Sequence, residues 1–153
     1  MRLVPAAELS TRLLTPADDQ QLAQSQLILG GQIHPQVFTG AVLEACIQVL
    51  DNYLFFLSDD IPHEDSLHIY RLDAHFALHE SLSIGAAYCT GAFVLRQLIA
   101  PAQVEFNFLG EGNWCLTLTP EPFTHVPFFS DPPGVRRPFC VRTRLKLKFT
   151  ARS

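Results

Sequence analysis

Four histidines lie close together in the chain and could take part in metal binding or proton transfer. They are interleaved with carboxylates, in the order His63, Glu64, Asp65, His68, Asp73, His75, His79 and Glu80. On a helix, His75 and His79 would share one face and could bind zinc. On a strand, which the local alternation favours, they would lie about 13 Å apart and could not share a metal ion. We therefore predict surface histidines, with no metal site and no cofactor.

The end of the chain carries a dense positive charge. Residues 134–153 hold seven basic side chains and no acid, a charge of +7, whereas residues 1–133 hold all fifteen acids and a charge of −11. The side chains predicted to bind a partner or an anionic ligand are Arg142, Arg144, Lys146 and Lys148. Such a split indicates an interaction with an acidic partner, a second copy of the chain included. The acidic remainder opposes attraction to nucleic acid, which ranks below a protein partner.

A proline-rich segment, residues 120–138, precedes this basic end. A loop of that length in a small protein usually serves a function or contacts a partner. It also carries phenylalanines, and aromatic anchors dominate binding hot spots. We predict that Phe128 and Phe129 bind a partner.

The four cysteines lie far apart, and no pair has the short spacing of a zinc or redox motif. They are Cys46, Cys89, Cys115 and Cys140. Because their neighbours are apolar, we expect free thiols that are buried as small hydrophobic side chains.

The elements that must position these residues begin with a predicted helix over residues 35–57. Ten apolar residues between Val37 and Leu57 recur at helical spacing. The polar residues of this stretch fall on one narrow stripe, so the rest of the helix should be buried. An earlier helix is expected near residues 15–24 and a short strand over residues 26–30.

Beyond residue 66 the apolar period changes to two, which is typical of strands. It predicts a strand over residues 67–78, a turn at residues 79–81, and a hairpin of residues 104–108 and 114–118. Residues 82–99 fit either a bent strand or a helix. A basic C-terminal strand over residues 139–150 should be half-buried, with its cations facing outward. The predicted class is α+β, with one long buried helix packed on an antiparallel sheet.

The 153 residues, 48% of them apolar, amount to one domain over residues 1–153. The longest apolar run, residues 53–57, is far shorter than the roughly 20 residues that cross a bilayer. The first residues lack the apolar core of a signal peptide. We therefore expect a cytoplasmic protein without a membrane span.

One stretch of the chain resembles a known superfamily. Gly30-Gly31-Gln32-Ile33-His34, followed by Glu44-Ala45-Cys46-Ile47-Gln48 on an apolar helix and then by strands, is similar to the hotdog fold of thioesterases and hydroxyacyl-thioester dehydratases. The resemblance covers residues 26–119. It departs from the dehydratase pattern in the spacing of His34 and Glu44 and in lacking a Phe-Pro-Gly signature.

The resemblance implies roles for three residues. A thioester carbonyl would lie at the helix N-terminus, where free N–H groups stabilise negative charge. Glu44 would act as general acid or base, and Gln48 would orient Glu44. His34 would supply the second proton-transfer group or orient the substrate. The basic strand would attract the phosphates of acyl-CoA or of an acyl-carrier protein.

Two hypotheses of function therefore stand side by side. The first is a hotdog-like protein that binds or acts on acyl thioesters. The second is a non-catalytic interaction or assembly module that uses the Pro/Phe-rich loop and the basic strand. It would form a homo-oligomer or bind a protein partner.

Overall fold

The computed structural model is built from β-strands and describes the whole chain except residues 62–63, 87–90, 127–128 and 152–153. The strands form three antiparallel sheets, and no described residue is helical. The predicted α+β class, with its long buried helix and hotdog-like arrangement, is therefore wrong. In the part of the chain that the structure describes, no helix is long and apolar enough to cross a membrane.

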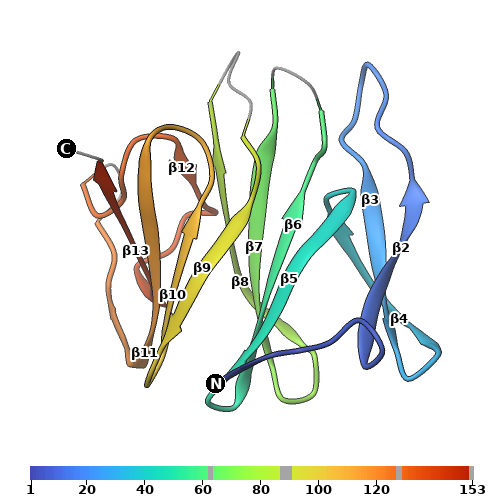
Figure 1. Ribbon diagram of the computed structural model, residues 1–153, viewed down its shortest axis with the longest axis horizontal. Helices are drawn as coiled ribbons and strands as arrows, with labels where there is room; N and C mark the ends of the chain where they lie inside the picture. The colour runs from blue at the N-terminus through green and yellow to red at the C-terminus, as the bar shows by residue number, and fades with distance from the viewer. Residues whose placement is uncertain (62–63, 87–90, 127–128, 152–153) are drawn as a thin grey trace.

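A six-stranded sheet forms the middle layer of the molecule (Figure 1). In spatial order its strands are β1 (Arg2–Leu3), β5 (Val42–Val49), β6 (Asn52–Ser58), β7 (Ser66–Asp73), β8 (Leu78–Gly85) and β12 (Val135–Arg136). The four central strands follow one another as hairpins. The two-residue strands β1 and β12 come from distant parts of the chain and cover the edges of β5 and β8.

Two smaller sheets flank the middle sheet (Figure 1). The four-stranded sheet has the order β13 (Arg142–Ala151), β11 (Gly112–Thr124), β10 (Gln103–Asn107) and β9 (Val94–Ile99). The three-stranded sheet has the order β2 (Leu9–Thr15), β3 (Gln24–Leu29) and β4 (Gln32–Thr39).

The middle sheet has a hydrophobic core on each face. Leu54 and Phe56 of β6 pack with residues of the four-stranded sheet such as Phe106. Their neighbour Phe55 points the other way and packs with residues of the three-stranded sheet such as Phe38. Because side chains alternate along a strand, both sets of residues in β6 are buried.

This double burial explains why the helix predicted over residues 35–57 is wrong. The stretch contains the end of β4 and all but the last residue of the β5–β6 hairpin. A strand buried on both faces is apolar at nearly every position, so it does not show the alternation of a half-buried strand. Between β4 and β5, Gly40 has φ +138°, and a Cβ there would lie 2.6 Å from the Cβ of Leu57. Glycine thus allows the chain to pass closely from one sheet to the next.

Several other boundaries differ from the predictions. The helix expected near residues 15–24 is the end of β2 followed by a loop, whereas the strand expected over residues 26–30 lies almost wholly within β3. The turn expected at residues 79–81 lies at residues 74–77, because β8 begins at Leu78. The ambiguous residues 82–99 contain the end of β8 and all of β9.

The strongest strand predictions are confirmed. The hairpin of residues 104–108 and 114–118 is β10 paired with β11. The basic C-terminal strand is β13, in which Thr143, Leu145 and Leu147 are buried and alternate with more exposed basic residues. The proline-rich segment is partly strand, since β11 extends to Thr124 and β12 lies within it.

Candidate functional site

The three residues expected to transfer protons do not form a common site. His34 lies on β4 of the three-stranded sheet, whereas Glu44 and Gln48 lie on β5 of the middle sheet. Glu44 is exposed and accepts a hydrogen bond from Ser58 at 2.8 Å, and the Gln48 side chain accepts one from Arg2 at 2.8 Å. A helix would place Glu44 and Gln48 on adjacent turns, but four residues along a strand span about 13 Å. Because Glu44 lies on a strand, the helix N-terminus that was expected to stabilise the thioester carbonyl is not present there.

The histidines expected near one another are distributed over separate pairs. His68 lies 2.9 Å from Asp59, and His79 lies 2.8 Å from Asp73, each distance joining a ring nitrogen to a carboxylate oxygen. His75 is in the turn between β7 and β8, and His63 falls outside the described residues. Within the described ranges, no group of three or more potential ligands could hold a metal ion.

Of the described thiols, Cys46 is buried as expected and the other two are half-buried. Cys46 lies in the core between the middle and three-stranded sheets, where burial raises its pKa to about 12. Cys115 and Cys140 are half-buried, and all three are free. Cys89 falls outside the described residues.

The basic side chains of β13 divide into two pairs. Arg142 and Arg144 donate hydrogen bonds to the carbonyl oxygens of Pro122, at 3.3 Å, and Thr119, at 2.8 Å. Lys146 and Lys148 are exposed, and neither forms an ion pair with a described residue. β13 is the edge strand of its sheet, and among the described strands it pairs only with β11.

A buried ion pair fixes the loop that leads into β13. We call this loop, residues 125–126 and 129–141, the binding loop. Arg137 donates two hydrogen bonds to Asp131, at 2.9 and 2.6 Å, and His125 lies 2.9 Å from the same carboxylate. The guanidinium of Arg137 also donates to the hydroxyl of Thr143 at 3.1 Å. The side chains of His125, Asp131 and Arg137 are at most 12% exposed, so buried polar contacts hold the loop in place.

The same network continues into the middle sheet. Thr143 donates a hydrogen bond to one oxygen of Glu80, and Arg71 donates to the other at 2.7 Å. Arg71 also donates to the side-chain oxygen of Asn52 at 3.0 Å. Polar bonds thus connect β6, β7 and β8 with β13 and the binding loop. Removing one partner of such a buried pair typically costs about 3–5 kcal/mol.

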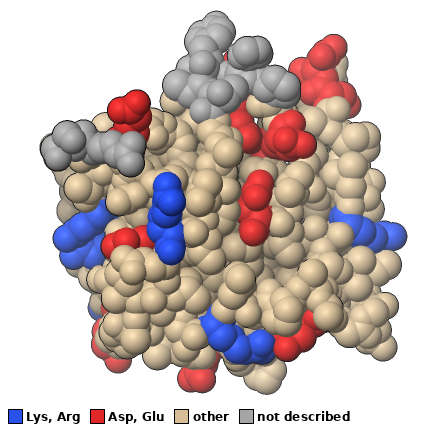
Figure 2. Space-filling model, in the orientation of Figure 1, with Lys and Arg blue, Asp and Glu red and all other residues tan. Residues whose placement is uncertain are grey.

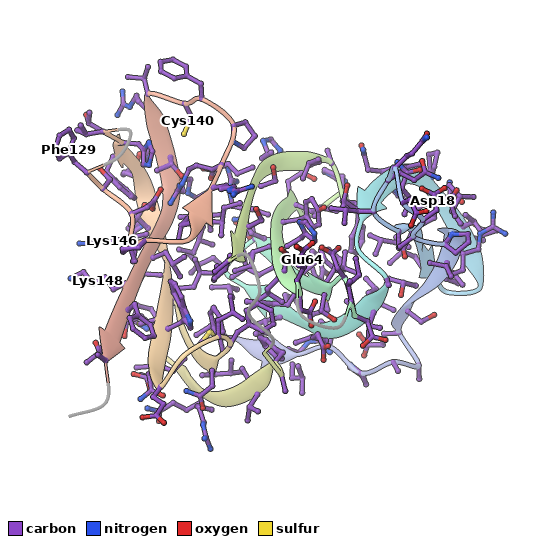
Figure 3. The ribbon with its side chains drawn as sticks, turned by 90° about the horizontal axis from the view of Figure 1, so that it is seen from above. Asp18, Glu64, Phe129, Cys140, Lys146 and Lys148 are labelled. Atoms are coloured by element: carbon purple, nitrogen blue, oxygen red, sulfur yellow. The ribbon has the colours of Figure 1, made fainter. Side chains whose placement is uncertain are left out.

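The outer side of the binding loop is apolar. Phe129 is 85% exposed, Phe139 is 84% exposed and Val141 is 60% exposed. A pocket of about 950 Å³ lies along the loop and is lined by its residues, Phe139 and Cys140 among them. Figure 3 shows Phe129 and Cys140 at the same end of the molecule as Lys146 and Lys148. Phe128, the other expected anchor, falls outside the described residues.

The sequence predictions missed the buried charges that contact the binding loop. The burial of Arg71 could have been inferred from the sequence. On the predicted strand it shares a face with Leu67 and Ile69, which are apolar and buried. Asp131 and Arg137 gave no periodic signal, since they meet only through the folding of an irregular segment. No family model, curated protein or solved structure matches the chain.

Proposed function

We propose that the protein is an interaction and assembly module that binds acidic protein surfaces with the binding loop and the outward side chains of β13. One observation carries this proposal: Phe129 and Phe139 are almost fully exposed on a loop that the buried Asp131–Arg137 pair holds in place. Aromatic side chains, phenylalanine included, are enriched in protein interfaces relative to the rest of the surface. A loop that is already ordered loses little conformational entropy on binding.

The charge distribution favours a second copy of the chain as the partner. Figure 3 shows Lys146 and Lys148 at one end of the molecule and Asp18 at the opposite end. In Figure 2, acidic side chains gather at the upper edge of the face shown, over the ends of β3 and β6. The exposed acids of the loops at these strand ends are Asp18, Asp19, Asp60 and Glu64. Asp18 and Asp19 make the end opposite the lysines acidic, so this end of one copy complements the basic and aromatic end of the next.

Such a contact joins two different surfaces. A head-to-tail interface leaves one unused surface at each end of a dimer, so further copies can add. The series ends only where the rotation between copies closes a ring. The expected product is therefore a series of oligomers whose average mass rises with protein concentration. The contact should weaken with salt, because the screening length falls from about 10 Å at about 0.1 M salt to about 3 Å at about 1 M.

Sedimentation equilibrium of the whole chain at low and high salt tests the proposal. Lys146→Glu with Lys148→Glu should abolish the rise in mass at low salt. Asp18→Lys with Asp19→Lys should do the same from the other end. A chain carrying all four substitutions should associate again, because both charges of the contact are then reversed.

Two controls separate this contact from general charge and hydrophobic effects. Arg12→Glu with Arg96→Glu removes the same charge from exposed positions elsewhere and should leave association intact. Phe129→Ser with Phe139→Ser should weaken association, whereas Ile33→Ser, at a residue 49% exposed on β4, should not. A parent protein that is monomeric at all concentrations and both salt levels would rule out self-assembly.

A further inference from the structure

A row of three polar side chains crosses the face of the middle sheet that the three-stranded sheet covers only in part. His68 on β7 is directly opposite Ser83 on β8, and Ser83 is directly opposite Arg136 on β12. The neighbours Leu82 and Ile84 point into the core on the other face, so this row points away from that core. Directly opposed residues of antiparallel strands have Cβ atoms about 4.5–5.5 Å apart, within which a serine hydroxyl can reach an imidazole nitrogen.

A buried carboxylate holds the imidazole of this row. One oxygen of Asp59 lies 2.9 Å from Nε2 of His68, and the Asp59 side chain is only 1% exposed. The other oxygen, Oδ2, is buried without a hydrogen-bond partner among the described residues. Buried carboxylates normally have partners on both oxygens, so this one needs an explanation beyond stability. Its contact with Nε2 leaves Nδ1 of His68 available for Ser83.

The row lies in a hollow of the surface. Two adjoining pockets, of about 470 and 280 Å³, share Leu22, Ser83 and Arg136 in their linings. His68 and Tyr70 line the larger pocket, and Asp59 lines the smaller one. A serine, a histidine and a carboxylate thus border one connected space, with a guanidinium beside the serine. Pockets of this size suit a short acyl group.

We propose that Ser83, His68 and Asp59 form a nucleophilic site that hydrolyses short-chain carboxylic esters. Ser83 Oγ attacks the acyl carbon while its proton passes to Nδ1 of His68, and the carbonyl electron pair moves onto oxygen. Arg136 stabilises that oxyanion. When the carbonyl re-forms, the bond to the alcohol breaks and His68 returns the proton to the leaving oxygen. Water then attacks the acyl-serine by the same route and releases the carboxylic acid.

The roles of the remaining groups follow from this sequence of steps. Asp59 is a positioning residue that holds the ring of His68 and stabilises its protonated form. Arg136 belongs to the binding loop and also lines the pocket along it, whereas Ser83, His68 and Asp59 lie outside the loop and β13. Labelling of Ser83 and sedimentation of the chain measure different properties, so either proposal can fail without the other.

Labelling of the intact protein by a fluorophosphonate, which phosphonylates activated serines, tests this site. Mass spectrometry of the labelled protein and its peptides should place one adduct on Ser83. Ser83→Ala should abolish the adduct and the hydrolysis of p-nitrophenyl acetate, whereas Ser10→Ala on β2 should retain both. His68→Asn should slow labelling by about 100-fold or more, the usual contribution of a general base.

Asp59→Asn provides a second measurement that distinguishes positioning from folding. It should slow labelling of Ser83 while far-ultraviolet circular dichroism still shows a folded chain. If Asp59→Asn does not fold, the comparison of His68→Asn with the parent protein decides the question. Labelling of Ser83 no faster than in the urea-unfolded chain, or an adduct on another serine only, would overturn the proposal.

Discussion

The two faces of the middle sheet are covered to different extents. On the face toward the four-stranded sheet, the core runs from β5 to β8, with Phe56, Ile69 and Leu82 at most 3% exposed. On the opposite face, the three-stranded sheet covers Phe55 and Leu72, but the β8 side chain Ser83 borders an open pocket. A larger sheet thus covers one face and contributes stability, whereas the smaller sheet leaves part of the other face free for polar side chains.

The largest expected effect tests the covered face. Phe56 is fully buried, and its ring centre lies 5.3 Å from that of Phe93 and 5.5 Å from that of Phe106. Phe56→Ala should lower the free energy of unfolding by about 3–5 kcal/mol, because it leaves a cavity between two sheets. Urea unfolding measures the loss, with Leu13→Ala at an exposed position of β2 as the control. A loss below about 1 kcal/mol would contradict the burial of this face.

A second prediction concerns the ion pair that ties the binding loop to the covered side. Asp131→Asn leaves the guanidinium of Arg137, only 6% exposed, without its counter-charge and should cost about 3 kcal/mol. Replacing both partners, Asp131→Leu with Arg137→Met, should recover part of this loss, since the charge of Arg137 is then removed together with its counter-charge. Urea unfolding gives both values, and Asp51→Asn, on an exposed turn, should leave stability unchanged.

Equal losses for the single and double variants would show that the pair does not act as a unit. Hydrogen exchange of the loop amides sharpens this comparison. Exchange at residues 129–141 should accelerate in Asp131→Asn and not in Asp51→Asn, because only the first substitution releases the loop.

A smaller effect is expected at the turn between β5 and β6. Leu50 has φ +54° and is 50% exposed. The predicted helix would have buried it in the core, so that prediction is wrong for this residue. Leu50→Gly should raise the free energy of unfolding by up to about 1 kcal/mol, because glycine adopts this conformation without strain. Thermal melting measures the change. The neighbouring Asp51→Gly should lower stability, since Asp51 does not have a positive φ.

The smallest effect belongs to an exposed counterpart of the His68–Asp59 pair. A hydrogen bond from His79, assisted by backbone N–H groups, lowers the pKa of Asp73 from 3.8 to about 2. A lowered pKa means that this carboxylate stabilises the fold above about pH 4 and that the contribution is lost as the pH falls through about 2. Carboxyl carbon NMR should show this midpoint, and His79→Gln should move it upward. A midpoint near 3.8 in the parent protein would contradict the pairing.

The strands that could be predicted from the sequence are those with one face exposed to solvent and the other face buried. In β13 and in the β10–β11 hairpin, apolar and polar residues alternate, and the period of two is visible in the sequence. In β6, Tyr53-Leu54-Phe55-Phe56-Leu57 meets a core on both sides, and the alternation disappears. A bulge near Glu44 in β5 shifts the alternation further. A buried run of this kind has the same composition in a strand and in a helix, so only its partners decide between them.

The candidate sites divide in the same way. The exposed position of Phe129 and the outward lysines of β13 follow from local composition and alternation. The Asp131–Arg137 pair and the row of His68, Ser83 and Arg136 depend on strand order, which no local pattern reveals. The histidines predicted to lie on the surface do so at His75 and His79, whereas the side chain of His68 is only 12% exposed.

The short strands at the edges of the middle sheet have a consequence for synthesis on the ribosome. Arg2 and Leu3 can pair with Gln48 and Ile47 only after β5 has been synthesised. In the same way, β8 can pair with β12 only after Arg136 has emerged. A nascent chain that ends at residue 124 contains β5 to β8, yet the edge of β8 has no partner. Unpaired strand edges are templates for pairing with other chains. The interval between emergence of β8 and of β12 is therefore a period in which the nascent chain is exposed to aggregation through this edge.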